Sequence, residues 1–570
     1  MKYLKENKIC QSCKKDFTIE SEDFNFYEKI KVPPPTFCPE CRMIRRMIWR
    51  NEHSLFRRPN DAPGKSESII SIYHPEQNLK VYDRETWWGD SWDPCSYEMD
   101  YDFLKSFFEQ FKNLMKNVPQ VAFIDSKSIN CRFCNVAVEF KNCYMANAGV
   151  ANEDSVYSNR ISKCKFIHDS YTCFTIEFGY EDVSCKESSK LFFSRESEAC
   201  LDSYFLYDCR NCVNCILCSN LRNKSYCIEN IQYTKEEYFK KKQELELHTR
   251  KGIKKAGAIF QELWKKAFHK HLKLTNTTNV LGDHVANSRN CQEVFDIEGD
   301  AESVKHSHWG VSGLKDSYDL GPGCGDAELM YESASVGVGN NRIFFSACVL
   351  SSRDIFYSYL LNNCSDCFGC VGLNKKQYCI FNKQYTKEAY KEMVSRIIEQ
   401  MKKVPYVDKV GKVYSFGEFF PSDLSPFAYN ETVAQDYYPI DKEKAKADGF
   451  LWREYNPNLY ETTIKGKDLP QTIAEVDNFI LNEIIECEVT GKPFRIIEQE
   501  LSFYRRFNLP LPSLHPDERH RRRLLQRNPM ILRKQMCYFG DKEVVTTYLP
   551  EEKGGPEKVI CTEHYNKEIY

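Results

Sequence analysis

Residues 142–185 read NCYMANAGVANEDSVYSNRISKCKFIHDSYTCFTIEFGYEDVSC, a run of short β-prone triplets separated by Asn, Asp, Ser and Gly. Within it, Cys143, Cys164 and Cys185 are evenly spaced, since 164 − 143 and 185 − 164 both equal 21. Short strands broken by turns at a nearly constant interval are typical of the coils of a right-handed parallel β-helix. We therefore predict a mainly β chain whose middle region is a β-solenoid with coils of about 20 residues. Small Cys and Ser side chains would stack along its inside.

This middle region is present twice. The segment Tyr226-Cys-Ile-Glu-Asn-Ile-Gln-Tyr-Thr-Lys-Glu-Glu-Tyr238 returns as Tyr378-Cys-Ile-Phe-Asn-Lys-Gln-Tyr-Thr-Lys-Glu-Ala-Tyr390, an offset of 378 − 226 = 152. The same offset carries the cluster Cys212, Cys215 and Cys218 onto Cys364, Cys367 and Cys370. A tandem duplication explains both matches, and the second copy is the less regular one.

The two ends of the chain are also related. One offset, 487 − 10 = 477, places Cys10 on Cys487 and Tyr27 on Tyr504. We therefore predict solenoid copies flanked by duplicated finger modules and by helices. The predicted order is an N-terminal treble-clef zinc-finger module (1–98), a helical cap (99–125), β-solenoid copy 1 (126–234), a basic helical linker (235–275), β-solenoid copy 2 (276–386), a helical and extended linker (387–480) and a C-terminal degenerate zinc-finger module (481–570).

Composition limits the class of protein. The 570 residues are 42% hydrophobic and 28% charged, which excludes a disordered chain, and the net charge of −2 confines any basic surface to a local patch. No signal-peptide core and no apolar run of membrane-spanning length occur, so we expect a cytoplasmic, non-membrane protein. In a reducing compartment the 27 cysteines are metal ligands or packed thiols rather than disulfides.

The strongest chemical signal lies at the N-terminus. Cys10-Gln-Ser-Cys13 and Cys38-Pro-Glu-Cys41 are two C-x2-C pairs. Four thiolates in two such knuckles close a tetrahedron around zinc and leave no open position, so we predict a structural zinc site. A knuckle, a hairpin and a second knuckle at the start of a helix are typical of treble-clef zinc fingers.

The other finger-like units are altered at the corresponding positions. A weak metal site and a metal-free fold are both open interpretations of the C-terminal module, with candidate ligands Cys537, Cys561, His564, Cys487 and His515. Thr490 and Gly540 stand where further ligands would be. The second N-terminal unit has Asn60, Pro63, Asp83 and Thr86, so we expect packing to replace the ion there.

The middle region contains 12 cysteines in the first copy and 7 in the second. The three-residue steps from Cys209 to Cys218 are similar to the cysteine run of ferredoxins, but no proline-flanked final Cys follows. Cysteine is among the most buried residue types, so we expect these thiols to be packing residues and predict no iron–sulfur cluster.

Basic residues follow the metal-binding pattern. Arginines recur at three- and four-residue steps in the helix predicted after Cys41, and a similar stripe follows His515. The linker between the copies is rich in lysine, a pattern that fits a solvated helical hairpin as well as a phosphate-binding patch. Such stripes neutralise phosphates, and the candidate nucleic-acid-binding residues are Arg42, Arg45, Arg46, Arg50, Arg519, Arg522, Arg523, Lys240, Lys241 and Lys242.

The chain resembles a family of uncharacterised zinc-finger repeat proteins encoded by small-genome bacteria of the candidate phyla. The resemblance rests on CQSC, CPECR, RNEHSLFRR, IISIYHP, WWGDSWD, NLRNKSYCIEN, VGLNKKQYCIFNKQYTKEAY, FFPSDLSPFAYNET, CEVTGKPFRII and HPDERH, and it covers essentially the whole chain. It implies the modular architecture and zinc binding, but no activity.

Three functions follow from these patterns. The first is a zinc-binding, non-enzymatic scaffold that binds nucleic acid, with RNA favoured, through the basic treble-clef helices. The second is a protein–protein interaction scaffold built on the solenoids. The third, a carbohydrate-active β-helix enzyme, rests on fold analogy alone. No HExxH, GxSxG or GxGxxG motif occurs, so we predict no catalytic residue; the sequence does not determine the ligand or the oligomeric state.

Overall fold

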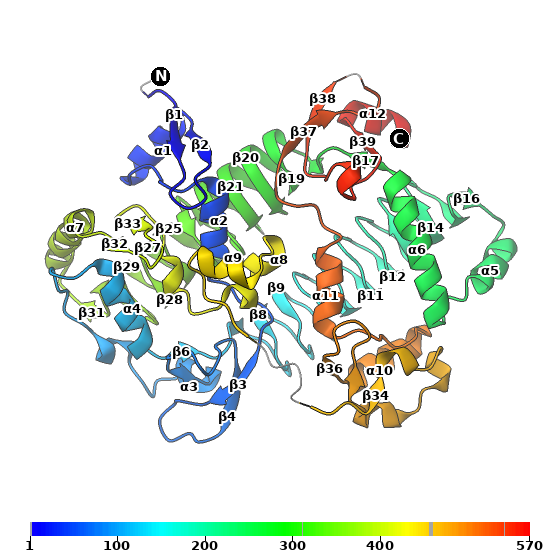
Figure 1. Cartoon of the computed structure of the whole chain (residues 1–570), viewed down its shortest axis with the longest axis horizontal. Coiled ribbons are helices and arrows are strands. Elements are labelled where there is room, and N and C mark those ends of the chain that lie inside the picture. Colours follow the sequence, from blue (N-terminus) through cyan, green and yellow to red (C-terminus); the bar gives the residue numbers. More distant parts are fainter. Residues whose placement is uncertain (1–2, 311, 455–459, 541) are drawn as a thin grey trace. The chain divides into compact units, whose positions relative to one another are not determined.

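The computed structural model describes residues 3–310, 312–454, 460–540 and 542–570 (Figure 1). The fold is mainly β, with helices flanking the sheets. The chain divides into two compact units, each assembled from two distant segments. Unit 1 comprises Met1–Phe123 and Leu272–Arg453, and unit 2 comprises Ile124–His271 and Glu454–Tyr570. Each unit therefore combines one terminal module with the middle copy that is farther from it in sequence.

The first middle copy, in unit 2, is an array of parallel strands that pair in sequence order. Lys165 pairs with Glu177, and Ser189 pairs with Leu201, so 177 − 165 and 201 − 189 both give an interval of 12. The predicted coil length of about 20 residues is therefore wrong. The strands are β7 (Asp125–Ser126), β8 (Asn135–Val138), β9 (Asn147–Val150), β10 (Lys165–His168), β11 (Glu177–Tyr180), β12 (Ser189–Phe192), β13 (Leu201–Tyr207), β14 (Val213–Ser219), β15 (Ser225–Ile228) and the antiparallel β16 (Ile231–Gln232).

The backbone of this array explains the misread interval. Every third residue from Lys127 to Tyr226 has a positive φ, so the chain turns after each three-residue step. Four such steps make one interval between paired strands. Cys143 and Cys185 are 42 residues apart, since 185 − 143 = 42. Because 42 is a multiple of three but not of 12, the two residues occupy equivalent inward positions without lying directly above one another. Asn130 and Asn142, which are 12 residues apart, do hydrogen-bond to each other at 2.8 Å.

Small polar side chains satisfy backbone groups inside the array. The Ser194 hydroxyl donates to the carbonyl of Phe192 at 3.1 Å and accepts from the N–H of Leu206 at 3.0 Å. The thiol of Cys200 likewise donates to the carbonyls of Glu198 and Cys209. All the middle cysteines except Cys131 are buried. They are therefore packed thiols with hydrogen-bond acceptors, as buried polar groups require.

The second middle copy, in unit 1, is also a parallel array but a less regular one. Thr278 pairs with Arg289, Ser288 with Ala301 and Arg353 with Ser365, so its interval varies, with 289 − 278 = 11, 301 − 288 = 13 and 365 − 353 = 12. Its strands are β18 (Leu274–Thr275), β19 (Thr278–Ala286), β20 (Ser288–Ile297), β21 (Ala301–Gly310), β22 (Leu314–Leu320), β23 (Ala327–Glu328), β24 (Tyr331–Ser333), β25 (Asn340–Phe344), β26 (Ala347–Leu350), β27 (Arg353–Phe356), β28 (Tyr359–Asn362), β29 (Ser365–Phe368), β30 (Gln377–Ile380) and the antiparallel β31 (Lys383–Gln384).

Helices cover the aromatic sides of both arrays. In unit 2, Thr234 caps α5 (Lys235–Glu244) in a capping box with Glu237, and α6 (Arg250–Lys266) packs on β13 and β14. In unit 1, α7 (Lys387–Lys403) packs on β30. The helix predicted at 99–125 is α4 (Phe107–Asn117), and its Phe107 ring lies 5.3 Å from that of Phe381 in the second array.

The terminal modules contain four hairpin-and-helix units. They are β1 (Glu6–Ile9), β2 (Asp16–Ile19), α1 (Asp23–Ile30) and α2 (Pro39–Met47); β3 (Phe56–Pro59), β4 (Ser68–Ser71), β5 (Val81–Tyr82) and α3 (Arg84–Trp88); β35 (Ile485–Glu486), β36 (Pro493–Phe494), α10 (Glu498–Phe507) and α11 (Pro516–Leu524); and β37 (Arg533–Met536), β38 (Glu543–Thr546), β39 (Lys558–Ile560) and α12 (Thr562–Ile569). In each unit the last helix begins directly after the third predicted ligand position, which is Cys38, Asp83, His515 or Cys561.

Short elements connect these parts. They are η1 (Pro94–Tyr97), β6 (Gln120–Val121), β17 (Phe268–Lys270), β32 (Tyr406–Val407), β33 (Val413–Tyr414), η2 (Ser422–Leu424), η3 (Tyr429–Glu431), α8 (Val433–Tyr437), α9 (Lys442–Ala447), β34 (Ile464–Lys465), η4 (Gly466–Asp468), η5 (Ile473–Glu475), η6 (Asn478–Asn482) and η7 (Glu551–Lys553). Among the residues that the structure describes, no helix combines the length and the apolar character that crossing a membrane requires.

Candidate metal centres and their surroundings

The four N-terminal cysteines converge. Cys10 and Cys13 lie in the turn between β1 and β2, Cys38 caps the N-terminus of α2, and Cys41 lies in its first turn. Their four sulfur atoms all lie within 4.8 Å of one another. The Sγ atoms of Cys13 and Cys38 are 3.7 Å apart, and a tetrahedron with metal–sulfur bonds of 2.3 Å has an edge of about 3.8 Å. The arrangement thus fits a metal ion held by four thiolates.

Local structure and burial prepare this group for a cation. The N–H of Cys10 donates to the carbonyl of Lys15, and the positive φ of Lys14 turns the chain so that both cysteines of the knuckle face inward. Hydrogen bonds from Cys38 and Cys41 lower the pKa of the Cys10 thiol well below its ordinary value, whereas the same contacts with Cys10, together with burial, raise the pKa of Cys38 and Cys41. A thiolate is the form that binds a metal ion, and four sulfur ligands leave no position for a substrate.

The arginines of α2 do not face solvent. Arg42 lies 2.9 Å from the carboxylate of Asp319, and Arg45 lies 2.9 Å from both Glu332 and Glu418. Arg46 completes this group, 3.2 Å from Asp319, and is fully buried. The prediction that this stripe faces phosphates is therefore wrong for these three residues. Buried guanidinium groups need internal anions, and here Asp319 and Glu332 of the second array and Glu418 of the following segment supply them.

Arg50 is also internal. Its guanidinium lies 2.6 Å from Glu52 and 4.7 Å from the centre of the Trp309 ring, and only 3% of the residue is exposed. The predicted role of Arg50 in nucleic-acid binding is therefore contradicted for the same reason. A side chain without exposed surface offers no contact to a phosphate.

The C-terminal module repeats this docking within unit 2. Arg519 of α11 forms an ion pair with Asp169, and Arg523 lies 3.1 Å from Asp169 and 3.0 Å from Glu181. Both arginines are buried, so their predicted exposure is also wrong. Arg522 is exposed, but it pairs with Glu518 at 2.9 Å on its own helix.

The two dockings correspond residue by residue. Arg42 and Arg46 match Arg519 and Arg523 at the offset that relates the two ends of the chain. The ring of Phe26 stacks on Tyr318 at 4.0 Å in unit 1, and the equivalent Phe503 stacks on His168 at 4.0 Å in unit 2. The duplicated modules therefore make the same contact with the two arrays.

The lysines of the linker are more accessible. Lys240 is exposed on α5, whereas the ammonium groups of Lys241 and Lys242 lie over the rings of Tyr233 and Tyr204. Burial lowers the pKa of Lys242. On α6 the exposed side contains Lys251, Lys254 and Lys255. The accessible positive charge of this region thus lies on α6 more than on the three lysines predicted.

A second group of metal-ligating side chains lies in the C-terminal module. The ligand atoms of Cys537, Cys561 and His564 all lie within 4.8 Å of one another. The structure thus brings together three of the five candidate ligands predicted in this module. Cys487 and His515 belong to no metal-holding group among the described residues. Instead, the His515 ring accepts a hydrogen bond from the N–H of Asp517 at 3.0 Å.

Hydrogen bonds replace the ion in the second N-terminal unit. The Asn60 amide donates to the Asp83 carboxylate at 2.9 Å, and the Thr86 hydroxyl donates to the same carboxylate at 2.7 Å. These three residues stand at predicted ligand positions. We expected packing to take the place of the ion in this unit. The structure shows a network of hydrogen bonds there, and the neighbouring Trp87 is buried.

Comparisons with protein-family models and with curated proteins found no match to this chain. The geometry of the described residues therefore carries the functional proposal.

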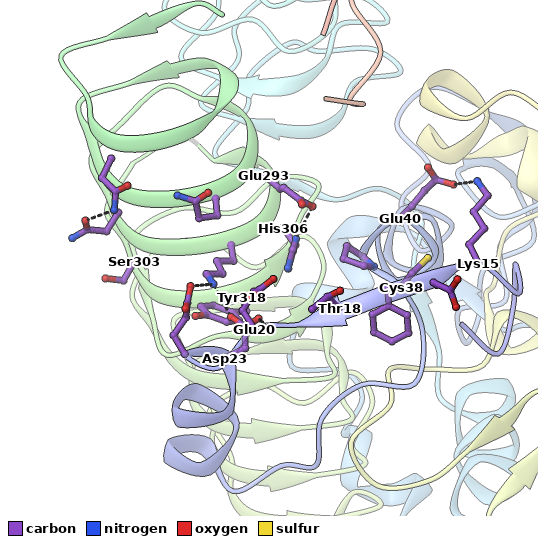
Figure 2. Close-up of a pocket in the computed structure, with 18 residues that line it drawn as sticks. Lys15, Thr18, Glu20, Asp23, Cys38, Glu40, Glu293, Ser303, His306 and Tyr318 are labelled. Carbon is purple, nitrogen blue, oxygen red and sulfur yellow. Dashed lines mark hydrogen bonds and ion pairs between the residues drawn. The ribbon is translucent and has the colours of Figure 1, made fainter. Parts of the chain in front are cut away.

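A groove of about 990 Å³ adjoins the four-cysteine group in unit 1 (Figure 2). It lies between β2, the start of α2 and the second array, and Figure 2 shows Cys38 and Glu40 on one side and His306 and Tyr318 on the other. Six carboxylates and two lysines line it: Asp16, Glu20, Glu22, Asp23, Glu40, Glu293, Lys15 and Lys305. The surface beside the metal ligands is therefore acidic and unfavourable for a polyanion.

The buried acids that pair with the arginines of α2 could not be identified from the sequence. Asp319, Glu332 and Glu418 belong to three separate segments, and no spacing connects them to α2. The helical spacing of the arginines indicated correctly that they share one face. It did not indicate what that face contacts, because a charged stripe has the same pattern on a solvated and on a docked helix.

Proposed function

We propose that this chain is a zinc-stabilised, non-enzymatic binding scaffold. One relationship carries the proposal: Cys38 of the four-cysteine group begins α2, and the arginines of that helix are tied to the second array by buried ion pairs. A metal ion that fixes the knuckles would fix the start of this helix. The metal centre then serves the assembly of unit 1.

Zinc is the ion that suits this site. Four thiolates are soft ligands, and a tetrahedral group of four sulfurs in a reducing compartment is typical of structural zinc. A closed coordination shell supplies no activated water, which favours a structural role over a catalytic one.

The proposal includes a finer architecture. We infer that the two arrays are parallel β-helices with coils of about 12 residues and that the hairpin-and-helix units are treble-clef fingers. The pairing of Lys165 with Glu177, the turn at every third residue and the side-chain ladder from Asn130 to Asn142 support the first inference. The helix that begins at the third ligand position supports the second.

A protein partner suits unit 1 better than nucleic acid does. The arginines that would contact phosphates are buried, and the groove beside the metal ligands is acidic. In unit 2, the exposed Lys251, Lys254 and Lys255 favour a second candidate, which is RNA binding through α6. The candidate site for nucleic-acid binding is thus α6 of the linker and no longer the helices of the finger modules.

The decisive experiment measures metal content and thermal unfolding of the purified full chain. We expect bound zinc in the wild type, and the loss of one zinc with a lower melting temperature in Cys13→Ser. The matched control is Cys95→Ser, because Cys95 is partly buried in unit 1 and lies outside the metal-holding groups of the described chain. Equal zinc content and equal melting temperatures in Cys13→Ser and the wild type would refute the proposal.

A further inference from the structure

We propose that Cys537, Cys561 and His564 form a second zinc-class metal centre that has three protein ligands and an open fourth position. Cys537 lies directly after β37, Cys561 caps the N-terminus of α12, and His564 lies in the first turn of that helix. This centre belongs to unit 2. It is independent of the four-cysteine group and of the scaffold role proposed for it.

The distances fit tetrahedral coordination. His564 Nδ1 lies 3.4 Å from the Sγ of Cys537 and 3.2 Å from the Sγ of Cys561. Metal–sulfur bonds of 2.3 Å and a metal–nitrogen bond of about 2.05 Å give a tetrahedral sulfur–nitrogen edge of about 3.6 Å. Both sulfur–nitrogen distances are therefore within a few tenths of an ångström of the tetrahedral value, and the two sulfurs lie within 4.8 Å of each other.

Backbone groups support both sulfurs. The N–H of Cys561 donates to the Sγ of Cys537 at 3.4 Å, and the N–H of His564 donates to the Sγ of Cys561 at 3.5 Å. Both cysteines are almost fully buried. Such N–H donors stabilise negative sulfur, which is the form that binds a metal ion.

The imidazole presents Nδ1 to both sulfurs, at 3.4 Å from Cys537 and 3.2 Å from Cys561. The ring of Phe539 packs against that of His564 with a centroid distance of 4.5 Å. The nitrogen that would bind an ion therefore already lies beside the two sulfurs.

Among the residues that the structure describes, the fourth position is open, because a glycine stands where the first centre has a cysteine. Gly540 follows Cys537 at the same spacing as Cys13 follows Cys10. A Cβ built on Gly540 would meet no atom within 4 Å, so the space for a side chain is free, although the φ of +75° at Gly540 is a backbone conformation that other residues rarely adopt. Three protein ligands and one free position are typical of zinc that binds water or an exogenous ligand.

The acid that contacts Cys561 does not close the site. Glu563 Oε2 lies 3.4 Å from the Sγ of Cys561, but the same oxygen forms an ion pair with Lys542. The Glu563 side chain is 75% exposed. We infer that Lys542 retains this carboxylate, so that water or a small anion takes the fourth position.

The first test is stoichiometry in the full chain, loaded with zinc and then desalted. We expect two zinc ions per wild-type chain, one in Cys561→Ser and one in His564→Ala, with the far-ultraviolet circular dichroism unchanged. A wild type with a single zinc that disappears in Cys13→Ser would refute this inference and leave the scaffold proposal intact. The opposite result, zinc lost only in Cys561→Ser, would refute the scaffold proposal alone.

The second test examines the open position with cobalt(II) in place of zinc and azide as the probe ligand. We expect azide to change the visible absorption of the cobalt-loaded wild type and of Glu563→Gln by similar amounts. Gly540→Cys adds the missing thiol and should abolish the response while it strengthens the sulfur-to-cobalt charge-transfer band, and Gly540→Ala controls for the strain of a side chain at this positive φ. A response that appears only in Glu563→Gln would show that Glu563 is the fourth ligand, and it would overturn the open site.

Discussion

Arg42 and Asp319 form an ion pair of 2.9 Å in which neither side chain has more than 2% of its surface exposed. The two residues stand 277 positions apart in sequence, yet they connect the helix of the metal-binding finger to the second array. Because a buried ion pair is strongly destabilised when one partner alone is lost, this contact is a sensitive point of unit 1.

Neutralising Asp319 should destabilise unit 1. In Asp319→Asn the guanidinium groups of Arg42 and Arg46 lose their shared carboxylate, and we expect a loss of about 3 kcal/mol or more in the free energy of unfolding. Trp264 is the only tryptophan of unit 2, so tryptophan fluorescence during urea unfolding reports mainly on unit 1.

The control for this variant is Glu399→Gln, which lies in the same unit. The pair of Glu399 and Lys402 is half-exposed on α7, and such surface pairs contribute about 0.2–1 kcal/mol. If Asp319→Asn unfolds at the same urea concentration as the control, the arginine stripe is not held by these acids.

His168 should make the stability of unit 2 depend on pH. Burial lowers the pKa of His168 to about 3 in the folded state, and the positive charge of Arg519 contributes in the same direction. Below pH 6.5 the unfolded chain binds a proton at this histidine and the folded chain does not, so stability falls as pH decreases from 6.5 towards 3. The expected slope is about 1.4 kcal/mol per pH unit.

His168→Phe tests this dependence because it preserves the ring that stacks on Phe503. We expect the unfolding free energy of unit 2, followed by circular dichroism in urea, to change less between pH 7 and pH 5 in this variant than in the wild type. The exposed His248 supplies the control, His248→Phe. Identical pH profiles for wild type and His168→Phe would contradict the prediction.

Removing the Ser194 hydroxyl should destabilise the first array. In Ser194→Ala the N–H of Leu206 loses its buried acceptor, and we expect the free energy of unfolding to fall by about 1–3 kcal/mol. Ser194→Cys should recover part of this loss, because at another inward position the Sγ of Cys218 accepts from the N–H of Asn230, 12 residues later, at 3.4 Å. Urea unfolding that ranks the two variants in the reverse order would contradict the ladder role.

Any binding of RNA should depend on α6. We expect the combined variant K251E, K254E and K255E to lower the affinity for a structured RNA at least tenfold at low salt and to reduce the salt dependence of binding. Arg522→Glu is the matched control, because Arg522 is exposed but already paired with Glu518. Fluorescence anisotropy with labelled RNA measures both. An equal loss in the two variants would contradict a specific role of α6.

Much of the candidate metal chemistry could be predicted from local spacing. Cys10, Cys13, Cys38 and Cys41 converge because two short knuckles and one hairpin place them, and the same spacing identified Cys537, Cys561 and His564. The strand interval could not be read from the cysteines alone. A turn at every third residue makes many spacings look regular, and only the pairing of strands, such as Lys165 with Glu177, selects the true interval.

By itself, the sequence determined the duplications, the four hairpin-and-helix units and the ligand positions, because each depends on residues close together in the chain. Only the tertiary structure decided which array each module contacts and what its arginines face. Arg42 meets Asp319, and Arg523 meets Asp169, across hundreds of residues. A guanidinium group is stable both in water and beside a buried carboxylate, so its partner depends on the folded neighbourhood and leaves no local pattern.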